Sequence, residues 1–155
     1  MKRVILVTGD RNWGWKYDPK LKKRVAVHEE IDFMRMVLDE MMIAPGVDLL
    51  VHGGADGLDT WAGGWARNRG VACERVPADW DQYGKSAGPI RNRKMYDDFK
   101  PLAVIAFHRD FNRSRGTKDM VTYALSKKEC TVVIHPSPVG ASTDDRTASK
   151  PTPAT

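Results

Sequence analysis

The sequence predicts an α/β protein with a Rossmann-like, doubly wound parallel sheet of about five strands and helices on both faces. Short apolar runs, of the kind that form strands buried on both faces, recur along the chain. They span residues 2–8, 47–51, 71–76, 102–107 and 130–134. Helical patterns alternate with these runs, and this alternation is typical of parallel sheets with right-handed crossovers.

Length and composition favour one intracellular domain. A chain of 155 residues can bury a sizeable core without disulfide staples, and we assign residues 1–136 to this domain. Cys73 and Cys130 lie in apolar runs, lack the C-x-x-C spacing of zinc sites and are expected to be reduced core thiols in the cytoplasm. No apolar stretch approaches the roughly 20 residues of a membrane span, so no membrane partner is expected. Residues 137–155 are rich in Pro, Ser and Thr and are predicted to form a disordered tail.

A basic, aromatic segment follows the first strand. We expect residues 10–24 to form a loop that holds Trp13, Trp15 and Tyr17 among six basic side chains. Such a loop can stack a base and bind its phosphate, or its tryptophans can pack on the domain. Arg11 is the strongest ligand candidate here because it lies nearest the strand end. The formal charge of +5 favours an anionic partner, either a nucleotide or a nucleic acid.

Residues 25–43 carry apolar side chains at helical spacing and are predicted to form a packing helix, with methionines that fill the core. Pro45-Gly46 ends this helix, and the second strand follows. The next helix carries Trp61 and Trp65 on one face. These two tryptophans belong either to the core or to a partner interface, and the second case would favour a homo-oligomer.

The motif VHGGADGLD at residues 51–59 links the second strand to that helix. Gly53 and Gly54 can adopt positive φ angles and carry no Cβ, so a phosphate or ribose can approach the backbone N–H groups. Asp56 precedes the helix, whose first N–H groups are expected to point into the same space. The alternative is a tight turn in which Asp56 and Asp59 only cap the helix.

Residues 77–95 form the next junction, in which Pro89 fits the first position of a helix. Arg91 and Asn92 follow, and an arginine and an amide beside a helix N-terminus can clamp a phosphate or a carboxylate. The alternative is a solvated basic face. A further junction follows the fourth strand, at Gly116-Thr117.

These junctions all follow strands, and ligands of doubly wound sheets bind beyond the carboxyl ends of the strands. We therefore predict one ligand site at that edge. Its candidate residues are Gly9, Arg11, Gly53, Gly54, Asp56, Asp59, Arg91, Asn92, Gly116 and Thr117. No metal site is predicted, because a strand end explains His52 and helix capping explains the two aspartates near it. No cofactor is required, although a phosphorylated ligand can bring Mg²⁺.

Five segments together resemble a known family. They read GDRNW at 9–13, HGGADGLD at 52–59, PADW at 77–80, GKSAGPIRNRKM at 84–95 and GTKDM at 116–120. As a set they resemble the YspA-like, YpsA-related branch of the SLOG superfamily, over roughly residues 4–134. The resemblance implies a Rossmann-like fold that binds nucleotides or nucleotide-derived ligands, in bacteria or their phages.

The superfamily also contains the Lonely Guy phosphoribohydrolases, which cleave the base from nucleoside 5′-monophosphates. Arg91 and Met95 match the Arg-Lys-x-x-Met motif of these enzymes, with Asn92 in place of the lysine. Gly116-Thr117 matches part of their second motif, Pro-Gly-Gly-x-Gly-Thr-x-x-Glu.

Met120 stands where that second motif has its glutamate. The replacement matters because a carboxylate usually stabilises the oxocarbenium-like state of glycosidic hydrolysis or activates water. Asp119 lies one position away, which is about 100° around a helix. An enzymatic hypothesis therefore depends on Asp119, Asp59 or Asp56 as the carboxylate of a nucleotide N-glycosidase.

Three hypotheses of function follow. In the leading one, the protein binds a nucleotide-derived small molecule as a sensor or a sequestering module. The second is the N-glycosidase. The third is a nucleic-acid binding module that uses the basic segment 11–24, and it predicts affinity that falls steeply with salt.

Overall fold

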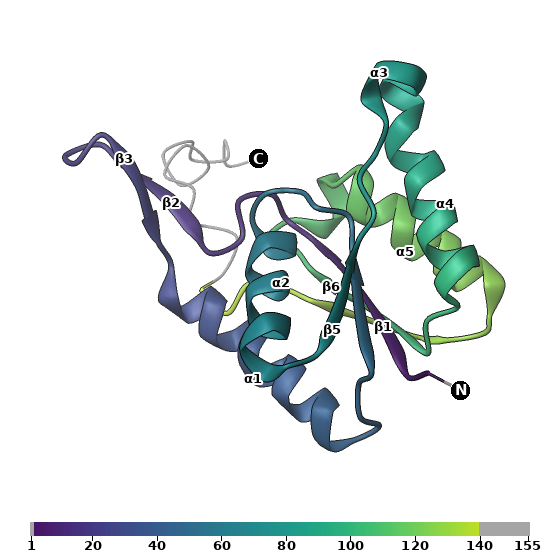
Figure 1. Ribbon diagram of the computed structural model, residues 1–155. Coiled ribbons are helices and arrows are strands. Elements are labelled where there is room, and N and C mark those ends of the chain that lie inside the picture. Colours follow the sequence, from purple (N-terminus) through teal and green to yellow (C-terminus); the bar gives the residue numbers. More distant parts are fainter. Residues whose placement is uncertain (1, 140–155) are drawn as a thin grey trace, which may run out of the picture.

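The computed structural model describes residues 2–139, and within them five parallel strands form one sheet in the order β5-β4-β1-β6-β7 (Figure 1). The strands are β1 (Val4–Gly9), β4 (Leu49–His52), β5 (Ala72–Arg75), β6 (Ala103–Phe107) and β7 (Thr131–His135). The chain builds outward from β1 through β4 and β5, then returns to the other side of β1 for β6 and β7. This order confirms the predicted Rossmann-like, doubly wound fold.

Two pairs of helices cover the two faces of the sheet (Figure 1). The helices α1 (His28–Ile43) and α2 (Leu58–Arg69) pack on one face, and α4 (Ala87–Phe99) and α5 (Gly116–Lys127) pack on the other. The first four residues of β1 are apolar because both faces of the strand are buried there. Ile5 and Val7 belong to the α1–α2 core, whereas Val4 and Leu6 belong to the α4–α5 core. A strand segment with both faces buried favours an apolar side chain at every position.

The prediction of a loop at residues 10–24 was wrong in one respect, because this segment enters an antiparallel hairpin. Strands β2 (Trp15–Asp18) and β3 (Lys23–Ala26) pair with each other, and α1 therefore begins at His28 rather than near Val25. The carboxylate of Asp18 closes the turn by accepting hydrogen bonds from the backbone N–H groups of Lys20 (2.8 Å) and Leu21 (3.2 Å). The hairpin projects from the body of the protein (Figure 1).

A second projection lies on the other side of the C-terminal edge of the sheet. It consists of the one-turn helix α3 (Trp80–Tyr83), a short 3₁₀ turn (Gly84–Ser86) and the start of α4 (Figure 1). Pro89 is the third residue of α4, not the first as predicted. The difference is tolerated because the first N–H groups of a helix have no partner within it.

The C-terminal segment starts inside the fold. The Ser137 hydroxyl donates a 2.7 Å hydrogen bond to buried Glu30, and residues 140–155 of the predicted tail lie outside the described residues. The prediction that Cys73 and Cys130 are core thiols was wrong, because Cys73 is exposed and Cys130 is half-buried. No helix within residues 2–139 combines the length and apolarity that crossing a membrane requires.

Candidate functional site

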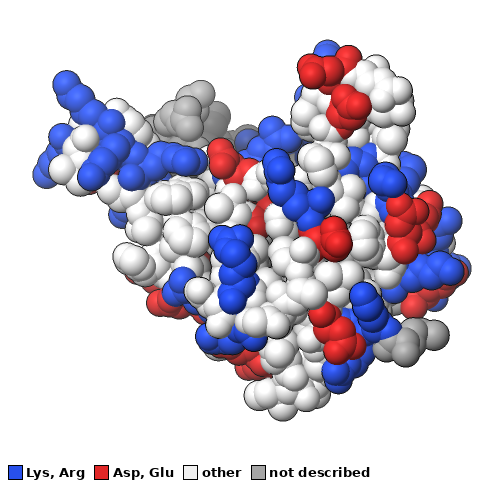
Figure 2. Space-filling view, in the orientation of Figure 1, with Lys and Arg blue, Asp and Glu red and all other residues white. Residues whose placement is uncertain are grey.

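A pocket of about 340 Å³ opens at the C-terminal edge of the sheet, beyond β1, β4 and β5. We call it the arginine pocket. Its lining residues are Arg11, Gly53, Gly54, Ala55, Asp56, Arg75, Pro77, Ala78, Trp80 and Arg91. In Figure 2, blue side chains gather over the hollow between the β2–β3 hairpin and the α3 projection. Of the predicted site residues, five line this pocket, namely Arg11, Gly53, Gly54, Asp56 and Arg91.

The glycine pair after β4 makes room for two of the arginines. A Cβ on Gly53 would lie 2.3 Å from Nη1 of Arg91, and a Cβ on Gly54 would lie 2.3 Å from Nε of Arg75. Gly54 also has a φ angle of +74°, which L side chains rarely adopt. The absence of side chains here therefore lets cationic groups lie against the backbone at the floor of the pocket.

Arg91 is fixed in place by its own hydrogen bonds. Its Nη1 donates to the backbone oxygens of Gly53 (2.7 Å) and Val76 (3.2 Å), and its Nε donates to Oδ1 of Asn92 (3.0 Å). Burial lowers the pKa of the guanidinium, and the nearby Asp59 carboxylate opposes this shift. These bonds tie α4 to the ends of β4 and β5 and hold a charged group at the pocket wall.

Arg11 and Arg75, in contrast to Arg91, are not held by bonds to the described part of the protein. Neither side chain makes a hydrogen bond or an ion pair with any residue between 2 and 139. Asp56 is the sole carboxylate among the lining residues, and its exposed side chain lies 3.9 Å from Arg24 of the hairpin. The arginine pocket therefore has an excess of positive charge, which attracts anions.

Asp59 is hydrogen-bonded to the glycine loop, residues 53–55, and does not line the pocket. Its Oδ2 accepts hydrogen bonds from the backbone N–H groups of Gly53 and Ala55, both at 3.1 Å. Its Oδ1 is buried with no hydrogen-bond partner in the described part of the chain. Burial raises the pKa of Asp59 to about 6, although the two N–H groups and Arg91 oppose the shift.

Asp56 does not cap α2, as the alternative interpretation of this motif required. Helix α2 begins at Leu58, and the residue before it is Gly57, with a φ angle of +73°. A Cβ on Gly57 would lie 2.4 Å from the backbone of Arg11. The chain needs a glycine at this point, and Asp56 is therefore pushed outward to the rim of the pocket.

His52 is a structural residue at the end of β4. Its Nδ1 accepts a 2.9 Å hydrogen bond from the backbone N–H of Gly54. Burial and the nearby Arg75, Arg67 and Arg91 lower the pKa of His52 to about 4, so the imidazole is neutral at pH 7. Among the residues that the structure describes, no three His, Cys, Asp or Glu side chains group closely enough to hold a metal ion.

Several candidates from the sequence connect elements rather than line the pocket. Asn92 donates through Nδ2 to the Gly116 backbone oxygen (3.1 Å) and to Oδ2 of Asp119 (3.0 Å), which ties α4 to α5. Thr117 is buried. Gly9 is required for packing, since a Cβ there would lie 2.4 Å from the Phe107 backbone oxygen.

Sequence reasoning missed Arg75 and Trp80 as pocket residues. A usable signal existed for both, because Arg75 is the last residue of a strand and Trp80 belongs to the quoted PADW segment. Asp79 caps α3 by accepting a 3.1 Å hydrogen bond from the Gln82 N–H, and Trp80 follows with half of its surface exposed. A flat aromatic ring is thus presented at one side of the pocket.

Trp13, Trp61 and Trp65 pack within the domain, and Trp15 is partly buried at the base of the hairpin, where its ring contacts Trp61. Trp13 is fully buried and donates through Nε1 to the Glu30 backbone oxygen (3.0 Å). Trp61 donates to the Trp13 backbone oxygen, and Trp65 donates to Oδ1 of Asp39. The alternatives left open for the tryptophans of segment 10–24 and of α2 are thus both decided in favour of packing within the domain. A homo-oligomer remains a prediction, and these tryptophans do not support it.

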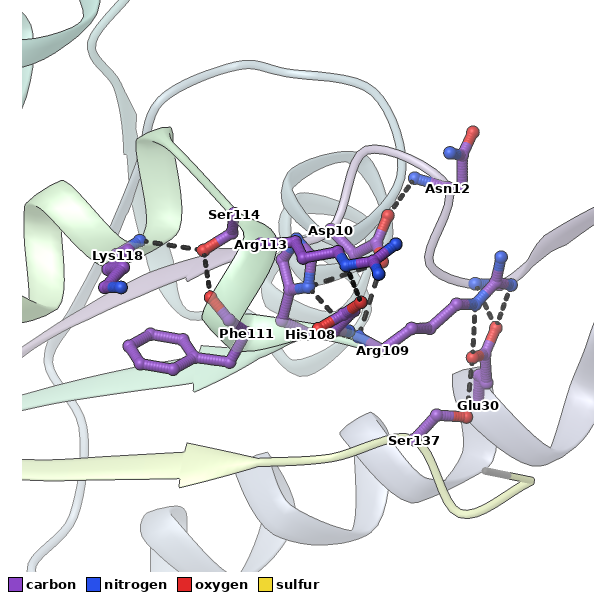
Figure 3. A network of polar contacts seen from close by, with 12 residues as sticks. Asp10, Asn12, Glu30, His108, Arg109, Phe111, Arg113, Ser114, Lys118 and Ser137 are labelled. Carbon is purple, nitrogen blue, oxygen red and sulfur yellow. Dashed lines mark hydrogen bonds and ion pairs between the residues drawn. The ribbon is translucent and has the colours of Figure 1, made fainter. Parts of the chain in front are cut away.

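A second polar cluster lies near the ends of β1 and β6 (Figure 3). We call its central part, Glu30 with Arg109 and Ser137, the Glu30 network. Oε2 of the fully buried Glu30 accepts from Nε of Arg109 (2.8 Å) and from the Ser137 hydroxyl (2.7 Å), while Oε1 accepts from the Gly14 N–H (2.9 Å). Burial alone would raise the pKa of Glu30, but the hydrogen bonds from Arg109, Ser137 and Gly14 hold it below its ordinary value.

Fold and site together define a Rossmann-like protein with a cationic pocket at the C-terminal edge of its sheet. The chain belongs to the YspA, cpYpsA-related SLOG family, whose model matches residues 3–83. It is also similar to the Gene 61 protein of Mycobacterium phage D29, with 37% identity over 121 residues. The alignment covers 75% of this chain and 83% of that protein. No solved structure matches. The resemblance inferred from the motifs is therefore confirmed.

Proposed function

We propose that this protein binds a nucleotide or a nucleotide-derived molecule in the arginine pocket, as a sensor or a sequestering protein. The observation that carries the proposal is the convergence of Arg11, Arg75 and Arg91 on one pocket with a single exposed carboxylate at its rim. A cytoplasmic location, in a bacterial cell or a phage-infected host, is part of the same proposal.

The pocket offers complementary groups for the two ends of a nucleotide. Guanidinium groups form paired, charge-assisted hydrogen bonds with phosphate oxygens, and Arg11 and Arg75 have donors free for this role. The half-exposed ring of Trp80 is available to stack on a base. The volume of about 340 Å³ lies at the lower end of the range of small-molecule sites, which supports a ligand of mononucleotide size. Mg²⁺ would enter only with the phosphates.

Carboxylate placement supports binding over hydrolysis. Asp119 accepts hydrogen bonds from Asn92 and lies within 3.4 Å of Arg93, and it does not line the pocket. Asp59 lies behind the glycine loop. Asp56 faces the pocket, but its side chain is largely exposed to water, where it cannot be held firmly against a glycosidic bond.

Calorimetry with a panel of nucleoside monophosphates, cyclic nucleotides and ADP-ribose derivatives tests the proposal. We expect one or more ligands to bind, and Arg75→Gln to weaken that binding by about 10- to 100-fold, since a charge-assisted contact is worth about 1.5–3 kcal/mol. The matched control is Arg35→Gln, which removes the same charge from α1, where Arg35 pairs with Asp32. Absence of binding across the panel would reject the proposal, as would equal losses in the two variants.

The enzymatic alternative is tested in the same samples. Wild-type protein is incubated with each nucleoside monophosphate, and free base is measured by chromatography. Release of base that is lost in Asp56→Asn, Asp59→Asn or Asp119→Asn would replace a binding function with catalysis. Bound ligand recovered intact would support a sensor or sequestering role.

A further inference from the structure

The β2–β3 hairpin concentrates most of the net charge of the protein. Residues 15–26 carry five cationic side chains and one carboxylate, a net +4, whereas the whole chain has a formal charge of +5. The cations are Lys16, Lys20, Lys22, Lys23 and Arg24, and all five are exposed. Figure 2 shows them as a blue extension that projects from the body.

Intramolecular contacts leave this charge almost unneutralised. Arg24 lies 4.8 Å over the Trp15 ring and 3.9 Å from Asp56. None of the four lysines makes an ion pair with a described residue. A cluster of solvated cations that do not pair within the chain is available to an anionic partner.

The cations lie on both faces of the hairpin and at its tip. Residues paired across an antiparallel ribbon share a face, and successive residues alternate. The register Tyr17↔Arg24 and Asp18↔Lys23 therefore places Arg24 beside exposed Tyr17 on one face, and Lys23 with Lys16 on the other. Lys20 and Lys22 occupy the turn between the strands. A partner must surround the ribbon to meet all of these charges.

The Glu30 network holds the base of the hairpin rigid. Glu30 accepts from the Gly14 N–H just before β2, and Nη2 of Arg109 donates to the Trp15 backbone oxygen (2.7 Å). The Trp15 ring also packs on Trp61, with 5.0 Å between ring centroids. An arm with a fixed base loses little conformational entropy when its tip binds.

The geometry points to duplex DNA as the partner, with the hairpin inserted in the major groove and its lysines on the flanking phosphates. A B-form major groove, about 12 Å wide and 8.5 Å deep, admits a two-stranded ribbon and presents phosphates on both sides. Four-residue strands span about 13 Å, which is comparable to the groove width, so lysines on the strands and in the turn can reach phosphates on both sides. An anionic membrane is flat and meets one face only. Because contacts between lysines and phosphates carry no sequence information, the proposed binding is independent of sequence.

Fluorescence anisotropy with a labelled 20-base-pair duplex, and with one of its strands alone, tests this inference. Each phosphate contact contributes about −0.9 to the slope of log affinity against log salt, so four lysines predict a loss of about 100-fold between 50 and 200 mM KCl. The variant K16Q/K20Q/K22Q/K23Q is expected to bind the duplex at least tenfold more weakly at 50 mM KCl and to lose most of the salt dependence.

The control variant K2Q/K94Q/K100Q/K118Q also removes four positive charges, but from exposed positions outside the hairpin. It is expected to bind the duplex within about threefold of wild type, and thermal unfolding is measured to verify that both variants fold. Three results overturn the inference. They are equal losses in the two variants, tighter binding to the single strand than to the duplex, and no duplex binding at 50 mM KCl, whether or not anionic vesicles bind. Nucleotide affinity in the arginine pocket is independent of all three.

Discussion

Arg109 and Arg75 both lie near the C-terminal edge of the sheet, but their surroundings differ. Arg109 is bonded to the buried carboxylate of Glu30, which also accepts from Ser137. Arg75 lies across Gly54 in the arginine pocket and meets no carboxylate. The difference lies in where the charge finds its partner. The Arg109 guanidinium is bonded to a carboxylate of the protein itself, whereas Arg75 has no bonded partner among the described residues and, under the proposed function, would receive one from an anionic ligand.

The largest effect is expected from Arg109→Met in the Glu30 network. Removing one member of a buried ion pair leaves the other charge uncompensated and typically costs about 3–5 kcal/mol of unfolding free energy. Urea denaturation at pH 7 measures the loss. The exposed pair Arg113–Asp110 supplies the control, because Arg113→Gln should change stability by less than about 0.5 kcal/mol. Equal effects of the two substitutions would remove the distinction between the two regions.

The pH dependence of stability tests Asp59, which stands behind the pocket. Its raised pKa means that the folded chain binds this proton more tightly than the unfolded chain, so ionisation of Asp59 opposes folding. The stabilisation is present at about pH 4 and is lost as pH rises toward the folded pKa of about 6. Asp59→Asn should therefore gain about 2–3 kcal/mol relative to wild type between pH 4 and pH 7. A constant difference, measured by urea titration at each pH, would contradict the raised pKa.

Arg91→Gln is expected to have an intermediate effect on stability, because Arg91 is both bonded within the protein and part of the pocket. It bonds to Gly53, Val76 and Asn92 and also lines the pocket. We expect a loss of about 1–2 kcal/mol in unfolding free energy, from hydrogen bonds that glutamine cannot rebuild. Ligand affinity should fall in the same variant. Denaturant unfolding and calorimetry on the same preparation separate the two effects, and unchanged stability would mean that the three bonds contribute nothing net.

The smallest effect on stability is expected from Arg75→Gln. The side chain has no bonded partner among the described residues, so its removal should change unfolding free energy by less than about 0.5 kcal/mol. With a nucleotide that binds wild type, the same variant should show a smaller rise in melting temperature at equal ligand concentration. A large destabilisation would instead assign Arg75 a structural role and would weaken the comparison.

The sequence predicted the strand positions and the edge that carries the pocket, because these depend on local patterns. Val4 to Val7 are apolar in succession, which is typical of a strand buried on both faces. The glycine pair was also identified, but for an incomplete reason. Gly53 and Gly54 give space to Arg91 and Arg75, two side chains that are distant from them in the chain. The hydrophobic periodicity of a segment does not indicate which distant side chains will contact it.

The sequence by itself determined the fold class, the family and the segments that meet at the C-terminal edge. Each of these follows from residue order, since hydrophobic period sets the elements and strand order sets the edge. Only the tertiary structure decided that Trp13 is buried, that segment 15–26 is a projecting hairpin, and that Arg75 and Trp80 face the pocket while Asn92 and Asp119 join two helices. The physical reason is that a charge or a ring acquires its role from its neighbours in space, and those neighbours come from distant segments.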